Sequence, residues 1–75
     1  MYELGKFYKV NKETFHITLQ STCPIEITRF YLHPDSKAPM AELKVYEKKG
    51  SKDVKVSFGI SVDYLMEGGK LLPFE

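Results

Sequence analysis

Apolar and polar residues alternate most regularly between positions 53 and 62. Every second position there carries an apolar side chain: Val54, Val56, Phe58, Ile60 and Val62. Because successive side chains of a β-strand point to opposite faces, this period predicts a strand with one apolar and one wet face. We expect Phe58 and Ile60 to belong to the core.

The period changes at Asp63, and residues 62–67 predict a single helical turn. Gly68 would close that turn, because glycine adopts the left-handed conformation common at helix C-termini. Residues 70–74 then form a short closing strand. Pro73 limits this strand to an edge of the sheet, because proline cannot donate to a strand ladder.

The N-terminal half predicts three further strands. Residues 5–10 place Tyr8 and Val10 on one face and Phe7 on the other, and a turn at 11–13 leads to a strand at 14–20. The next strand, 25–32, is irregular, because strict alternation sends two apolar pairs to opposite faces: Ile25 with Ile27, and Phe30 with Leu32. Either a β-bulge near Thr28 and Arg29 resolves this conflict, or both faces of the strand are partly covered there, and we favour the bulge.

A prolyl loop at 33–39 precedes a strand at 40–48. Its alternation points three side chains inward: Ala41, Leu43 and Val45. A turn at 49–52 joins this strand to the one that begins at Val54, so these two strands should form the most stable hairpin.

Five to six short strands with one helical turn predict an all-β domain that spans residues 1–75, either a small antiparallel barrel or a small β-sandwich. The order of strand, helical turn and short final strand resembles an SH3-like barrel, mainly over residues 40–74. This is a resemblance of architecture, since the acidic loop, the tryptophan and the ALYDY-type stretch of peptide-binding SH3 domains are missing.

Composition narrows the classes of function. The 75 residues carry a net charge of +1, which gives no global attraction to nucleic acid or anionic membranes. Cys23 is the single cysteine, so no intrachain disulfide can form. No apolar run suits a signal peptide or a membrane span, and we expect a cytoplasmic protein with no membrane partner.

No set of residues predicts catalysis. His16 and His33 lack the spacing of a metal site, and Cys23 has no neighbouring base to activate it. We therefore expect no enzyme activity, no metal and no cofactor. Two binding hypotheses remain.

The first hypothesis is a non-catalytic protein-binding module, such as a small phage-type or bacterial accessory or inhibitor protein. Its anchors would be three tyrosines with no obvious place in a small core: Tyr31, Tyr46 and Tyr64. An edge strand, either the first strand or the one with Pro73, would pair with another protein or with a second copy as a homodimer.

The alternative is a small β-barrel that binds single-stranded DNA or RNA. Lysines interleave with aromatic residues on the first strand, and more lysines crowd the hairpin turn: Lys6, Tyr8, Lys9, Lys48, Lys49 and Lys52. Small barrels bind single strands through such cationic and aromatic surfaces. This hypothesis requires the two lysine groups to share one face.

Overall fold

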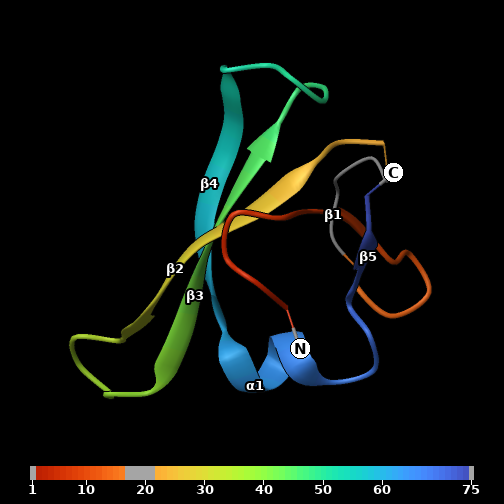
Figure 1. The fold of residues 1–75 in the computed structure, drawn as a ribbon. Helices are drawn as coiled ribbons and strands as arrows, with labels where there is room; N and C mark the ends of the chain where they lie inside the picture. The colour runs from red at the N-terminus through yellow and green to blue at the C-terminus, as the bar shows by residue number, and fades with distance from the viewer. Residues whose placement is uncertain (1, 17–21, 75) are drawn as a thin grey trace.

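The computed structural model describes residues 2–16 and 22–74. The elements follow one another as β1 (Phe7–Val10), β2 (Ile25–Leu32), β3 (Pro39–Tyr46), β4 (Val54–Ser61), α1 (Val62–Met66) and β5 (Leu71–Pro73). The strands form one antiparallel sheet in the order β4-β3-β2-β1-β5 (Figure 1). The expected all-β class is confirmed.

The sheet is open, so neither the barrel nor the two-sheet sandwich describes it. Closure would require β4 to pair with β5 at the other end of the strand order. β5 has only three residues and ends at Pro73, so it offers too short a ladder for a second neighbour. The first strand is also not an edge, as β1 lies between β2 and β5.

The core lies on one face of β2 and β3, beneath α1 and the turn after β1. Its buried apolar residues are Tyr8, Val10, Phe15, Cys23, Ile25, Ile27, Ala41, Leu43, Val45, Leu65 and Leu71. Phe58 and Ile60 pack against this cluster but stay half-buried, because β4 has a neighbour on one side only. The expected β3–β4 hairpin is confirmed, with Leu43 opposite Phe58.

The predicted bulge in β2 is confirmed. The register with β3 shifts between Ile27, which lies opposite Leu43, and Arg29, which lies opposite Glu42. Thr28 is the extra residue, so the face of each later residue is reversed. As a result Phe30 lies opposite Ala41 and shares the inner face with Ile27.

The bulge also gathers polar groups on the outer face. The Thr28 hydroxyl donates to Glu42 Oε1 at 2.7 Å, and Arg29 Nε donates to the same oxygen at 3.4 Å. The hydrogen bond from Thr28, followed by the charge of Arg29, lowers the pKa of the Glu42 carboxyl below its ordinary value. This contribution to stability is present above the ordinary carboxyl pKa and is lost as the pH falls through the lowered one.

Replacing Thr28 with valine, which keeps the shape and removes the hydroxyl, is expected to raise the pKa of Glu42 toward its ordinary value. NMR titration of the Glu42 carboxyl carbon would measure this shift. The Glu13 carboxyl, far from the bulge in the chain, serves as the internal control. An unchanged Glu42 titration would contradict the assignment of Thr28 as the main cause.

The predicted helical turn is confirmed as α1. Ser61 caps its N-terminus, where the Ser61 hydroxyl accepts the Tyr64 backbone N–H. The chain then turns through Gly68 and Gly69, which both have positive φ angles of 61° and 64°. Glycine takes this conformation without the strain a side chain would add, so the chain can return toward β5.

A strand was predicted at 14–20. Residues 14–16 do not form a strand, so the prediction is wrong there, and residues 17–20 lie outside the described part of the chain. The turn that begins at Asn11 extends further than expected, because the Phe15 backbone N–H donates to the Asn11 carbonyl at 2.8 Å. Phe15 is thereby directed into the core, with 1% of its surface exposed. Tertiary burial decides the conformation at this turn over local strand propensity.

The same turn holds the C-terminal segment beside β1. The Asn11 side-chain amide donates to the Gly69 carbonyl at 2.9 Å, and the Asn11 backbone N–H donates to the Lys70 carbonyl at 2.9 Å. Lys70 Nζ donates to the Thr14 carbonyl at 2.9 Å. These contacts fix β5 against β1 and so determine which residues share the surface beside β5.

In the part of the chain that the structure describes, no helix is long and apolar enough to cross a membrane.

Candidate functional site

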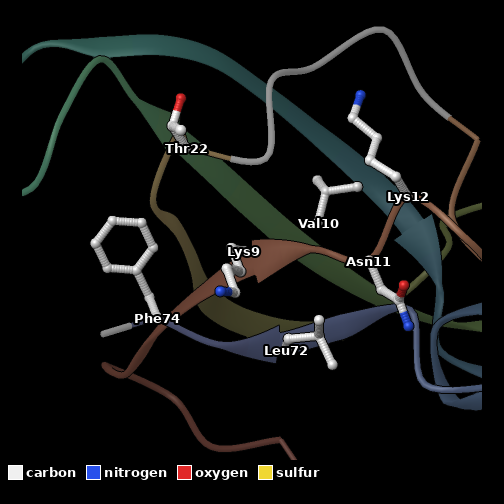
Figure 2. A pocket seen from close by; sticks show the side chains of 7 residues that line it. All are labelled: Lys9, Val10, Asn11, Lys12, Thr22, Leu72 and Phe74. Atoms are coloured by element: carbon white, nitrogen blue, oxygen red, sulfur yellow. The ribbon is translucent and has the colours of Figure 1, made fainter.

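Lysines from both predicted groups meet beside β5. Lys6, from the segment before β1, and Lys49, from the turn after β3, line the same pocket of about 430 Å³. Lys9 and Lys12 line a second pocket of about 470 Å³ (Figure 2). Phe74 lines both pockets. We call the surface formed by Lys6, Phe7, Lys9, Lys12, Lys49 and Phe74 the lysine–phenylalanine surface.

Phe74 is positioned by the antiparallel pairing of β5 with β1. Its backbone N–H donates to the Phe7 carbonyl at 3.2 Å, which continues the ladder past Pro73. The Lys49 ammonium lies 6.0 Å from the centre of the Phe74 ring. A cation at this distance is attracted to the ring face, and this contact joins the β3–β4 turn to the C-terminal segment.

The aromatic residues of this surface differ from those predicted. Tyr8, predicted to stack on bases, is 7% exposed and packs edge-on against Tyr2, with ring centres 5.2 Å apart. Its hydroxyl accepts the Glu3 backbone N–H at 2.8 Å. Phe7, on the opposite face of β1, is 38% exposed. The rings of this surface are therefore those of Phe7, which meets the Tyr46 ring edge-on with ring centres 5.8 Å apart, and of Phe74, which is half-buried. The sequence pattern included Phe7 among the first-strand lysines but did not single out Phe74.

Lys6 forms an ion pair within the surface. Lys6 Nζ lies 2.7 Å from the Glu3 carboxylate, and both side chains are exposed. This hydrogen-bonded ion pair lowers the pKa of Glu3 and raises the pKa of Lys6. Lys48 and Lys52, also predicted to bind nucleic acid, are exposed in the β3–β4 turn but line neither of these two pockets.

The three predicted tyrosine anchors do not form one surface. Tyr31 and Tyr46 both lie on the outer face, but Tyr31 is opposite Met40 at the start of β3, whereas Tyr46 ends β3. At about 3.4 Å per residue, six residues separate Met40 from Tyr46 by about 20 Å. Tyr64 lies on α1, with its ring 5.8 Å from that of Phe15.

Local contacts also account for these tyrosines. The Tyr46 hydroxyl donates to the Glu26 carboxylate at 2.7 Å, and this hydrogen bond raises the pKa of Tyr46. The Arg29 guanidinium lies 4.7 Å from the centre of the Tyr31 ring. The Lys70 ammonium lies 4.6 Å from the Tyr64 ring. Each ring covers the rim of the sheet or the core.

The histidines and the cysteine have structural surroundings. His33 Nδ1 accepts the backbone N–H groups of Asp35 and Ser36, at 3.1 and 3.3 Å, and so orders the β2–β3 loop. His16 is exposed, and Cys23 is 3% exposed within the core. Across residues 2–16 and 22–74, no three His, Cys, Asp or Glu side chains are grouped so as to hold a metal ion.

The chain was compared with protein families, with curated proteins and with solved structures, and none of these comparisons returned a match. Any function must therefore be argued from the lysine–phenylalanine surface and the open sheet themselves.

Proposed function

We propose that this protein binds single-stranded nucleic acid on the lysine–phenylalanine surface. The observation that carries the proposal is the shared position of Phe74, which lines both lysine pockets and lies beside Lys49. Four lysines from two separate parts of the chain thus surround the exposed Phe7 ring and the half-buried Phe74 ring. Single-strand binding requires this combination, with cations along the backbone and rings for the bases.

Each part of the surface has a physical role in this proposal. Lys6, Lys9, Lys12 and Lys49 would each neutralise a phosphate, and for Lys6 the phosphate would replace the Glu3 carboxylate. Phe7 and Phe74 would each stack on a base, a contact worth about 1–3 kcal/mol. Stacking and phosphate contacts read no base edges, so we expect little sequence preference.

The net charge of +1 limits the affinity. Attraction is local to this surface, because the acidic residues of the chain, Glu3 beside Lys6 among them, nearly balance the basic ones. We therefore expect binding to be weak at physiological salt and strong only at low salt.

The experiment is a titration of fluorescently labelled oligothymidine with the full chain at several salt concentrations. Four phosphate contacts predict a slope of log affinity against log salt of about −2.8, so affinity falls roughly fiftyfold between 50 and 200 mM salt. No binding at the lowest salt concentration would overturn the proposal. A duplex of equal length serves as the comparison and should bind more weakly, because its bases are not free to stack.

Replacing Glu3 with glutamine is expected to strengthen binding severalfold at low salt. The substitution removes the carboxylate that holds Lys6 at 2.7 Å and leaves the backbone N–H of residue 3 free to donate to Tyr8 as before. A gain is specific to this ion pair if it exceeds the gain from an equal change in net charge elsewhere. Glu67→Gln changes the net charge equally, on an exposed residue after α1, and is the matched control. Equal gains in both variants would attribute the effect to net charge alone.

The tyrosine-anchored protein surface is not proposed, because its three rings lie on separate parts of the molecule.

A further inference from the structure

The outer edge of β4 is the longest free edge of the sheet. β4 has eight residues, and among the described strands it pairs only with β3 (Figure 1). The opposite edge is β5, with three residues and a proline. Unpaired backbone N–H and C=O groups along such an edge are a template for another strand.

The usual protections against strand pairing are missing over most of this edge. Lys55 is the only charged residue of β4, and it lies where the register with β3 shifts, between the partners Val54 and Val56. From 56 to 61 the strand pairs regularly and has neither charge nor proline. On the outer face, Ser57 has a small side chain and Gly59 has none. The Tyr31 hydroxyl occupies the space above Gly59, where a β-carbon would overlap it. Nothing on this stretch would repel an incoming strand.

The apolar face of the sheet is also exposed to solvent along this edge. Val54 is 43% exposed and Val56 is 38% exposed. Phe58 and Ile60 are half-buried beside the core. An added strand would bury these side chains and extend the core without changing the fold.

We propose that β4 pairs antiparallel with β4 of a second copy, about a two-fold axis at Phe58. Opposite residues in a symmetric antiparallel pair have position numbers that add to twice that of the residue on the axis. Phe58 therefore faces its own copy, Val56 faces Ile60, and Ser57 faces Gly59. This register uses only the regular part of β4 and leaves Lys55 outside the paired segment.

The chemistry of β4 favours a second copy as the occupant. Aromatic and β-branched pairs lie across from one another on the core face, and cross-strand pairs of this kind stabilise sheets. No like charges face each other between 56 and 60.

The dimer leaves the lysine–phenylalanine surface free. β1 and β5 stand at the far side of each sheet from β4, so they form the two ends of the joined sheet. The proposed dimer therefore does not depend on nucleic-acid binding, and a separate experiment tests it.

The test is sedimentation equilibrium of the full chain across a range of concentrations. The wild type is expected to rise from 8.7 kDa toward twice that mass and to stop there, because two-fold pairing consumes both edges. Ser57→Lys places a charge at the exposed centre of the edge and is expected to weaken the dimer roughly tenfold or more. Leu72→Lys, on the exposed face of β5, is the matched control and should dimerise as the wild type does.

Two results would overturn the proposal: a wild type that stays monomeric up to millimolar concentration, or equal dimerisation of the wild type and Ser57→Lys. Circular dichroism of each variant checks that it is folded. The register has its own readout, since nitroxide labels on Lys55→Cys should be separated by about 20 Å along the strands, six residues at about 3.4 Å each. A spacing of four residues, about 14 Å, would place the axis at Ser57 and contradict an axis at Phe58.

Discussion

Replacing Leu43 with alanine is expected to lower the free energy of unfolding by about 3–5 kcal/mol. Leu43 is fully buried and lies between Ile27 on β2 and Phe58 on β4. Its neighbours are held on both sides by strand ladders, so they cannot collapse into the cavity. A chain of this size has a total free energy of unfolding of about 4–11 kcal/mol. At the lower end of that range, this loss would leave most of the molecules unfolded.

Urea denaturation followed by circular dichroism would measure this loss. Phe58→Ala is the comparison, measured at a concentration at which the chain is monomeric. Because Phe58 is half-buried on the edge strand, we expect it to lose only about half of the 3–5 kcal/mol typical of a buried phenylalanine. A greater loss at Phe58 than at Leu43 would show that the centre of the core lies on β4.

Reversing the charges of Lys9 and Lys49 together is expected to weaken oligonucleotide binding roughly hundredfold at low salt. The Lys9→Glu/Lys49→Glu variant changes one lysine in each pocket. Two phosphate contacts are lost, so the salt slope should fall from about −2.8 to about −1.4. Both residues are on the surface, and the stability of the fold should change little.

The matched control is Lys37→Glu/Lys55→Glu. It changes the net charge by the same amount, but Lys37 lies in the β2–β3 loop and Lys55 on β4, and neither lines the two pockets. The control should keep the wild-type salt slope. If both double variants lose affinity equally, binding follows total charge and the lysine–phenylalanine surface is not the site.

The bulge in β2 shows what a local pattern can predict. Two apolar pairs could not share a face by strict alternation, which left either a bulge or partial cover of both faces, and the bulge was favoured. The structure places that residue at Thr28. Tyr8 shows what the pattern missed. Alternation placed Tyr8 and Val10 on the same face, but only the structure shows that this face is the core, where the Tyr8 ring is buried and unavailable for stacking.

The expected strand at 14–20 shows where local propensity misleads. Residues 14–16 alternate as a strand would, yet the hydrogen bond from Phe15 to Asn11 turns the chain and buries the Phe15 ring. No periodicity in the sequence distinguishes a ring buried by a strand from one buried by a turn. Only the core that Phe15 enters decides between them.

The sequence by itself determined the strands β1 to β5, the faces of β2 and β3 and the glycine turn after α1. These features depend on side-chain period and on residues with special backbone freedom, both of which act within a few positions. The tertiary structure decided that β4 is the free edge, that the sheet stays open and that Lys6 and Lys49 share one pocket with Phe74. Strand order depends on contacts between distant segments, which no local pattern contains.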